Sequence, residues 1–399
     1  MKVGIFLGHP AHFHYFKNTA RQLKADGHTV FFAVKEKDIL EELMCDAEFE
    51  YDKVRGKREK SDKWHLSKSA IEIDWKLGRF VRKYKIDILI GAILPYASRL
   101  SGTRAIVIGE DDAAVVPMYS WLALPGANNI VSPAVCDNWL WEYKSVKYPA
   151  NLELAYLHPN HFTPSREVVE GYGMLLKERG DKLEVSGEQN PFAPYFILRF
   201  ASLNAHHDNG IKGINTEVAQ RLIDILSPHG RIYITSERPL EPQFEQYRIH
   251  INPLDMHHVM AFASLYIGDS QTMAAEAGVL GVPFVRFNDF VGRIGYLREL
   301  EDKYELGYGI HATPLAADSP IRRADGLAQP SGVEALYERV EQLVAMPAEE
   351  RKATFQSRRE KMLSEKIDCA KFLTWFIENY PQSAEETKKA DEAFWERFK

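Results

Sequence analysis

Short apolar runs alternate with amphipathic stretches along most of this chain. In its first part, the runs that we expect to form buried strands cover residues 3–7, 29–34, 49–54, 87–93, 104–109 and 129–132. Between them, apolar residues recur at the three- and four-residue spacing that is typical of helices. Strands that alternate with helices predict an α/β fold, in which a parallel sheet is covered by helices on both faces.

A second alternating series follows. Its expected strands cover residues 195–200, 231–235, 248–251, 265–268 and 282–287. The intervening segment, 148–194, is rich in proline and holds a charged stretch, as domain linkers do. At 399 residues the chain is long enough for two domains. We therefore predict an N-terminal domain over 1–165, which the last helices (366–399) rejoin, and a C-terminal domain over 190–365.

One stretch, LYIGDSQTMAAEAGVLGVPFVR at 265–286, combines a strand, a capped turn, a helix and the next strand. Asp269 and Ser270 stand where a helix N-cap belongs, and Gly281 and Pro283 end the helix. A helix that begins at the carboxyl end of a strand presents unpaired backbone N–H groups and a partial positive charge. The stretch therefore predicts a site for a pyrophosphate or another anion.

Two kinds of side chain add to this predicted site. Ser270 and Thr272 bring hydroxyl donors to the helix tip. Glu276 lies one to two turns into the helix, where its carboxylate is placed to accept hydrogen bonds from a ribose diol. Phosphate at the tip and an acid for the sugar are the layout of a nucleotide-sugar site.

The same stretch resembles the donor-site segment of the GT-B superfamily, especially that of UDP-N-acetylglucosamine 2-epimerases, where Asp-Ser-Gly-Gly leads to Glu-Glu-Ala. Asp-Ser at 269–270 and Glu-Ala at 276–277 fall at matching spacing, whereas Gln-Thr at 271–272 replaces the paired glycines. The Asn-Pro-Leu lead-in at 252–254 is also similar. The phrase Gly-His-Pro-x-His-x-His-Tyr-Phe-Lys-Asn resembles an incompletely characterised family tied to bacterial and archaeal surface-carbohydrate genes.

The resemblance implies a GT-B fold, in which two Rossmann-like, doubly wound parallel-sheet domains face a cleft and are followed by C-terminal helices. It assigns the nucleotide-sugar donor, a UDP-sugar, to the second domain. There the backbone near Leu254 would contact the base, Ser270, Gln271 and Thr272 would bind the pyrophosphate, and Glu276 would bind the ribose.

Four more residues complete the expected donor site. Asn204, His206 and Lys212 lie in the polar loop after the strand at 195–200, which also ends at the carboxyl edge of its sheet. His206 corresponds to a histidine that the epimerases use near the diphosphate, and Lys212 is placed to stabilise a departing UDP. Arg293 adds a charged contact to phosphate if it is not engaged in a surface ion pair.

The first domain offers candidates for a catalytic base. His9, His12 and His14 lie in and beyond the loop after the first strand, and Glu110 and Asp111 follow the strand at 104–109. Imidazole titrates near working pH, which suits the deprotonation of a sugar hydroxyl, and we favour His14 or one of the two acids as the base. Closely spaced histidines also occur at metal sites, but we expect neither a metal nor a tightly bound cofactor.

Composition narrows the remaining possibilities. The net charge of −6 indicates no general attraction to nucleic acid or to anionic membranes. The three cysteines have no metal-type spacing and are expected to be reduced thiols. With neither a signal peptide nor a membrane span expected, we predict a cytoplasmic location. Peripheral membrane contact through a lipid-linked substrate and a homodimer both agree with the sequence.

Three functions follow from these observations. The first is a glycosyltransferase that uses a UDP-sugar to extend a saccharide or lipid-linked acceptor in surface polysaccharide or glycolipid assembly. The second is an epimerase similar to UDP-N-acetylglucosamine 2-epimerases, although Gly-His-Pro at 8–10 replaces their Gly-Thr-Arg-Pro opening and 91–95 lacks their Asp-bearing segment. The third is a non-catalytic protein that binds a nucleotide sugar.

Overall fold

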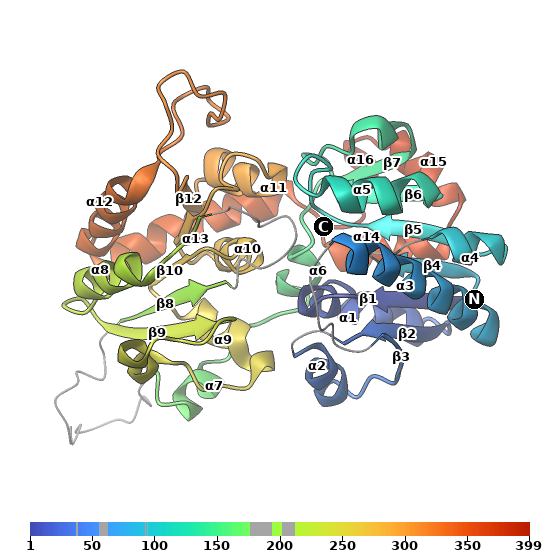
Figure 1. Cartoon of the computed structure of the whole chain (residues 1–399), viewed down its shortest axis with the longest axis horizontal. Helices are drawn as coiled ribbons and strands as arrows, with labels where there is room; N and C mark the ends of the chain where they lie inside the picture. Colours follow the sequence, from blue (N-terminus) through green and yellow to red (C-terminus); the bar gives the residue numbers. More distant parts are fainter. Residues whose placement is uncertain (37–38, 56–62, 92, 94, 176–193, 202–211) are drawn as a thin grey trace. The chain divides into compact units, whose positions relative to one another are not determined.

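The computed structural model describes residues 1–36, 39–55, 63–91, 93, 95–175, 194–201 and 212–399. These residues form two compact units (Figure 1). The first unit comprises Met1–Phe162 together with Glu365–Lys399, and the second comprises Thr163–Ser364. The last helices therefore belong to the same unit as the first strand. No helix among the residues described is both long and apolar enough to cross a bilayer.

The first unit is built on a seven-stranded parallel sheet with the order β3-β2-β1-β4-β5-β6-β7. Its strands are β1 (Lys2–Leu7), β2 (Thr29–Lys35), β3 (Tyr51–Arg55), β4 (Ile88–Gly91), β5 (Arg104–Ile108), β6 (Asn129–Pro133) and β7 (Ser145–Tyr148). All the strands predicted in this part of the sequence are present. β7 was not predicted, because Ser-Val-Lys-Tyr is short and half polar and therefore lacks the apolar run of a buried strand.

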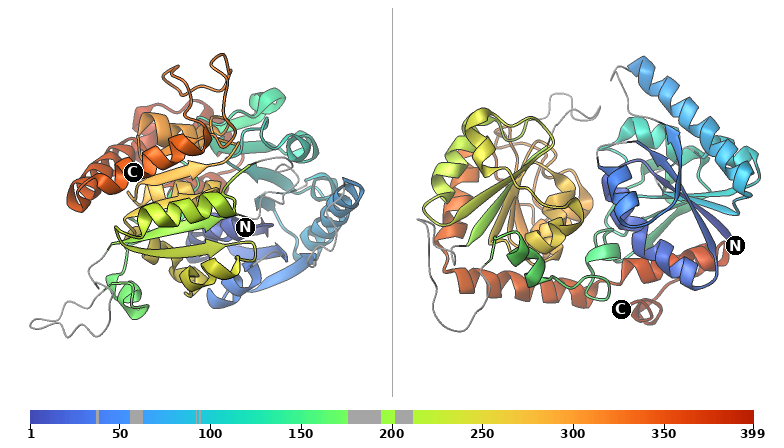
Figure 2. Two further views of the ribbon diagram at one scale, coloured as in Figure 1. Left: turned by 60° about the vertical axis from the view of Figure 1, so that its left-hand side comes forward. Right: turned by 90° about the horizontal axis from the view of Figure 1, so that it is seen from below.

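Helices cover both faces of this sheet (Figure 2). They are α1 (Pro10–Ala25), α2 (Leu40–Asp46), α3 (Lys63–Tyr84), α4 (Tyr96–Leu100), α5 (Pro117–Ala123), α6 (Leu154–Leu157), α14 (Cys369–Glu378), α15 (Gln382–Lys388) and α16 (Glu392–Glu396), with the 3-10 turns η1 (Leu124–Gly126) and η2 (Trp139–Lys144). Leu77 and Phe80 of α3 are buried in the same core as Leu89 of β4. On the other face, α14 and α6 pack against α1.

The second unit is built on a five-stranded parallel sheet with the order β12-β11-β10-β8-β9. Its strands are β8 (Tyr195–Phe200), β9 (Arg231–Ser236), β10 (Leu265–Gly268), β11 (Phe284–Phe287) and β12 (Gly307–Ile310). The strand predicted at 248–251 is wrong. Arg248 forms a single bridge to Ile234, and this bridge is not extended into a ladder before the chain turns at Asn252-Pro253. The sequence did not predict β12, because Gly-Tyr-Gly-Ile has little strand propensity.

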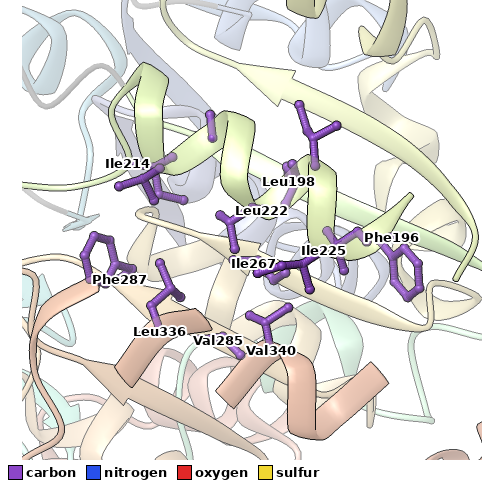
Figure 3. Packing of buried hydrophobic residues seen from close by; sticks show 14 of the residues in the cluster. Phe196, Leu198, Ile214, Leu222, Ile225, Ile267, Val285, Phe287, Leu336 and Val340 are labelled. Atoms are coloured by element: carbon purple, nitrogen blue, oxygen red, sulfur yellow. The ribbon is translucent and has the colours of Figure 1, made fainter. Parts of the chain in front are cut away.

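The helices of the second unit enclose its sheet. They are α7 (Arg166–Gly171), α8 (Thr216–Leu226), α9 (Met256–Ala261), α10 (Gln271–Val279), α11 (Gly295–Arg298), α12 (Gly332–Ala345) and α13 (Ala348–Glu365), with 3-10 turns η4 (Pro242–Tyr247) and η5 (Pro253–Asp255) and the π turn η6 (Glu299–Lys303). Figure 3 shows Leu222 and Ile225 of α8 and Leu336 and Val340 of α12 packed over Ile267 of β10. This core fixes the strand ends on which the candidate site is built.

Each sheet has one topological switch point, where neighbouring strands send the chain in opposite directions. In the first unit it lies between β1 and β4, and in the second between β8 and β10. Ligands of open α/β sheets bind outside the carboxyl ends of the strands at such points. The loops after β1 and after β10 therefore lie where a ligand of each sheet is expected to bind.

Candidate functional site

The turn from β10 to α10 is held tightly. A side chain at Gly268 would meet the Tyr266 hydroxyl at 2.6 Å, so only glycine fits at this strand end. Ser270 is the N-cap of α10, and its Oγ accepts a long hydrogen bond from Met273 N at 3.5 Å. At the other end, Gly281 has a φ of +76° and its N–H, like that of Val282, bonds back into the helix as in a Schellman cap. The predicted strand, cap, helix and stop are confirmed.

Asp269, next to the N-cap, has a role that the sequence did not indicate. It is buried, and its Oδ1 accepts a hydrogen bond from Ala201 N at 2.6 Å while its Oδ2 accepts one from Ile214 N at 3.2 Å. One carboxylate therefore holds both ends of the connection between β8 and α8. Burial raises the pKa of Asp269 to about 6. The spacing had suggested only a capping residue here.

Asn288, at the end of β11, orients the first residue of α10. Its buried amide Nδ2 donates to Asp269 O and to Gln271 Oε1, both at 2.9 Å, and its Oδ1 accepts from Phe290 N at 2.9 Å. The Phe290 N–H can bond only to the oxygen of the Asn288 amide, so the Asn288 NH₂ group faces Gln271. Gln271 must therefore turn its own amide oxygen toward Asn288 to accept this hydrogen bond. The NH₂ group of Gln271 is thereby left as a donor at the helix tip.

Two cations lie on the same edge of the second sheet. The backbone of Lys212 pairs with Asp289, since Lys212 N donates to Asp289 Oδ2 at 2.9 Å and Asp289 N donates to Lys212 O at 3.3 Å. The side chain of Lys212 is exposed, as is that of Arg293 in the loop after β11. Within the described part of the chain, no carboxylate lies within 4.0 Å of either cation. The surface ion pair considered for Arg293 is therefore not seen among these residues.

Glu276, the predicted ribose ligand, is buried, and its Oε1 lies 3.0 Å from Nε2 of His257 on α9. This pair ties α10 to the segment that contains Leu254, whose N–H donates to Asn252 Oδ1 at 2.8 Å. Glu276, the predicted ribose ligand, is thereby linked to the segment that is predicted to contact the nucleotide base. His257 was not predicted, because a histidine in a short amphipathic helix is more often a packing residue than a partner of a distant acid.

The remaining donor-site residues divide into two groups. Thr272 is partly exposed in the first turn of α10, one residue after Gln271. Asn204 and His206 lie outside the described residues. The structure therefore brings Lys212, Ser270 and Gln271 to the β8/β10 switch point, with Thr272 beside them.

In the first unit, the tip of α1 is closed by its own side chains. His9 is the N-cap, and its Nδ1 accepts a hydrogen bond from Ala11 N at 3.2 Å. Pro10 has no N–H to offer, and Gly8 N donates to Nδ1 of His12 at 3.2 Å. The N–H groups that an anion would need are consumed or missing. This junction does not have the character of a phosphate site.

His14 lies deeper than its place near the loop suggested. It is 9% exposed on the inner side of α1, where its ring packs against Tyr156 with a centroid distance of 5.2 Å. Its Nδ1 lies 3.4 Å from Nζ of Lys17. A base in this position reaches a substrate only through its other ring nitrogen.

Glu110 and Asp111 differ in their surroundings although they are adjacent. Glu110 is buried, and its carboxylate accepts hydrogen bonds from the Tyr15 hydroxyl at 2.5 Å and from Leu152 N at 3.3 Å. Asp111 is exposed at the same strand end. Since the rings of His14 and Tyr15 both pack against Tyr156, Glu110 and His14 belong to one cluster in the first unit. No group of three or more His, Cys, Asp or Glu side chains is arranged to hold a metal ion in the ranges described.

The sequence matches a protein-family model. A family model described as "Protein of unknown function (DUF354)" matches residues 1–290. No curated protein matches the sequence significantly.

Solved structures with the same fold are numerous. A complex of Staphylococcus aureus MnaA with UDP has a TM-score of 0.61 at 10% identity, covering 96% of this chain and 97% of that one. A putative UDP-N-acetylglucosamine 2-epimerase from Listeria monocytogenes has a TM-score of 0.58 at 12% identity, covering 98% and 97%. The spinosyn rhamnosyltransferase SpnG, complexed with spinosyn aglycone, has a TM-score of 0.54 at 13% identity, covering 95% and 100%. At these identities the similarity establishes the fold, and the prediction of a GT-B fold is confirmed.

Proposed function

This chain belongs to the DUF354 family, and we propose that it is a glycosyltransferase that binds a UDP-sugar donor on its second unit. The acceptor in this proposal is a saccharide or a lipid-linked saccharide of surface polysaccharide or glycolipid assembly. The proposal concerns the reaction and its substrates. The fold alone is compatible with several reactions.

The observation that carries the proposal is an excess of hydrogen-bond donors at the β8/β10 switch point. The tip of α10, the NH₂ group of Gln271 and the ammonium group of Lys212 all offer protons. Two buried side chains, Asp269 and Asn288, hold the loops that carry them. Donors that have no acceptor among the described residues are complementary to a diphosphate, and donors fixed in advance stabilise a leaving nucleotide without reorganisation.

In this proposal, residues on α10 and next to α9 bind the base and the ribose of the donor. The backbone around Leu254 contacts the base, and Glu276 contacts the ribose. Because Glu276 also pairs with His257, replacing it by alanine would disturb both contacts at once. Glu276→Gln, which keeps an oxygen facing His257, is the better probe of the ribose contact.

The chemistry requires one base and a stabilised leaving group. The base takes the proton of the acceptor hydroxyl, the hydroxyl oxygen forms a bond to the anomeric carbon, and the bond from that carbon to the diphosphate oxygen breaks. UDP departs with the bonding electrons, and Lys212 and the α10 tip stabilise its charge. Arg293 adds a second cation to the departing diphosphate.

We assign the base to the first unit, at His14 or at one of the acids 110–111. Glu110 already accepts two hydrogen bonds, one of them from Tyr15, so its replacement also removes a structural contact. Asp111 is exposed and can be replaced with less disturbance. Asp111→Asn, His14→Gln and Tyr15→Phe together separate a base from a positioning group, because only loss of the base abolishes turnover and leaves UDP binding intact.

An epimerase similar to UDP-N-acetylglucosamine 2-epimerases is the alternative. The fold match to two such proteins over nearly the whole chain favours keeping it. The two reactions differ in their need for an acceptor. Incubation of the protein with UDP-N-acetylglucosamine and other UDP-sugars, followed by NMR of the products, tests the proposal. UDP release only when a saccharide acceptor is present supports transfer, a new UDP-sugar without acceptor supports epimerisation, and binding without turnover supports the non-catalytic function.

A further inference from the structure

Exposed apolar side chains gather on one part of the first unit. They belong to α5 and to the turn η2, and we name them the α5–η2 face: Met118, Trp121, Leu122, Trp139, Leu140 and Tyr143. Exposure reaches 58% for Trp121, 70% for Leu140 and 75% for Tyr143. Side chains of this size and kind are normally buried, and a cluster of them on a surface marks an interaction site.

The two halves of the face are joined. The ring of Trp121 on α5 meets the ring of Trp141 in η2 edge to face, with a centroid distance of 5.1 Å. Trp141 itself is buried in the core of the first unit. Through this contact the exposed side chains are anchored to the core of the first unit. Figure 1 labels α5 in the first unit, beside β6 and β7.

The face has almost no charge. The sequence contains no acidic or basic residue from 113 to 136. In η2 the two charged side chains are engaged elsewhere: Lys144 Nζ donates to Pro125 O at 2.9 Å, and Glu142 Oε1 accepts from Asn138 N at 2.7 Å. Ser120 donates back into its own helix, to Val116 O at 3.0 Å.

Trp139 shows that the exposure is built into the backbone. Its φ is +51°, a left-handed conformation that bulky residues rarely adopt. The conformation is held because Trp139 N donates to Asp137 Oδ1 at 2.8 Å. A residue with a small side chain or none would satisfy this turn with less strain, yet the position holds a partly exposed indole. Strain retained in this way points to a use for the side chain.

We propose that the α5–η2 face docks onto the surface of a neutral lipid bilayer, with its indole and phenol rings in the interfacial layer. Tryptophan and tyrosine prefer that layer because their rings are apolar and their N–H or O–H groups remain hydrated. A protein partner would require hydrogen bonds, about one for each 100–200 Å² of interface. Ser120 and Lys144 donate back into the first unit, so the exposed ring N–H and O–H groups of the face are its main hydrogen-bonding groups, and these suit the hydrated interfacial layer.

The charges at its border select the kind of lipid. Asp137 and Glu142 are the acidic residues nearest to the exposed rings in the sequence, and the chain carries a net charge of −6. Glu142 is neutralised by Lys147, whose Nζ lies 3.0 Å from Glu142 Oε1. The border therefore offers no excess of positive charge to attract an anionic surface, and the apolar contacts drive binding. The inference does not depend on the proposed reaction, because binding to lipid is measured without any substrate.

Co-sedimentation with phosphatidylcholine vesicles tests the proposal. We expect the double variant Trp121→Ser with Leu140→Ser to lower the partition coefficient by about tenfold or more, because two large apolar groups no longer enter the lipid. The matched control is Leu327→Ser with Val333→Ser, which alters two exposed apolar residues of the second unit and should bind like the unaltered protein. Thermal melting should be unchanged in the control variant, and the double variant should melt slightly earlier because Trp121 loses its ring contact with Trp141.

Several results would overturn the proposal. The first is no vesicle binding by the unaltered protein, and the second is equal loss in the control variant. A third is stronger binding on addition of phosphatidylglycerol with no effect of the double variant, which would indicate an electrostatic contact elsewhere. Sedimentation velocity supplies a fourth: a dimer that the double variant dissociates, without vesicle binding, would make a second copy of the chain the occupant of the face.

Discussion

The first and second units begin a helix at the same place in the same kind of sheet, but with opposite chemistry. In the first unit, α1 starts with Pro10, which lacks an N–H, and His9 caps the next donor. In the second unit, α10 starts with Gln271, whose amide oxygen is held by Asn288 so that its NH₂ group stays available. Equal backbone geometry therefore gives one helix tip that is closed and one that is open to an anion.

The difference shows where specificity for the donor resides. Strand, turn and helix alone would predict an anion site at either tip. The side chains around the turn decide which tip keeps its donors, and in the second unit these side chains include Asp269 and Asn288, both buried. Replacement of those supporting residues, or of the donors themselves, should remove the difference between the two helix tips.

The largest effect is expected for Asn288→Ala. The substitution leaves the carbonyl of Asp269 and the N–H of Phe290 buried without partners and opens a small cavity. We expect the free energy of unfolding to fall by about 4 kcal/mol in urea denaturation. The exposed amide of Asn379, bonded only within its own helix, provides the control, and Asn379→Ala should change stability by less than about 0.5 kcal/mol. A loss below about 1 kcal/mol for Asn288→Ala would contradict this account of the junction.

Asp269 makes the open junction sensitive to pH. Burial raises its pKa from 3.8 to about 6. Between those values the folded protein keeps a proton that the unfolded chain has lost. The free energy of unfolding therefore falls as pH rises from about 4 to about 6, by about 3 kcal/mol for a shift of this size, and then levels off. Asp269→Asn should remove that slope in a pH series of unfolding curves, and an unchanged slope in this variant would assign the proton to another group.

Removal of the donors should weaken nucleotide binding. Lys212→Ala and Gln271→Ala each delete one contact to the diphosphate, and calorimetric titration with UDP should show about tenfold weaker affinity for each, or about 1.4 kcal/mol. Lys212 is exposed, so its replacement should leave stability nearly unchanged, whereas Gln271→Ala should lower the free energy of unfolding by about 1 kcal/mol because the buried Asn288 amide loses one acceptor. Equal affinity in the variants and the unaltered protein would remove these residues from the site.

The smallest effect is expected at the closed tip. His9→Ala removes the N-cap of α1 and should lower the free energy of unfolding by about 1 kcal/mol. It should leave the affinity for UDP as it was, which makes it the matched control for the two donor variants. Weaker UDP binding in His9→Ala would mean that the two junctions are not as different as their hydrogen bonds indicate.

The architecture was largely predictable because its signals are local. Apolar runs gave nearly all the strands, and the Ser270 cap and the Gly281 stop gave both ends of α10. The exceptions have local causes too. Gly-Tyr-Gly-Ile in β12 has low strand propensity but pairs with β11 nonetheless, and 248–251 has strand-like residues but runs into Asn252-Pro253.

The site was predictable only in part, because its supports come from distant segments. Ser270 and Gln271 follow from the sequence of one turn. Asn288 and His257, which hold Gln271 and Glu276, act over separations that no local pattern encodes. The burial of His14 could not be foreseen either, since it depends on packing against Tyr156, far along the chain.

Hydrogen exchange measured with and without UDP tests the central claim most directly, because it reports on both helix tips in one experiment. The account predicts slower exchange on UDP binding for peptides covering 269–274 and 212–216, and no change for the peptide covering 8–13. Protection confined to 8–13, or no protection at either tip with UDP in excess, would contradict the assignment of the nucleotide to the second unit.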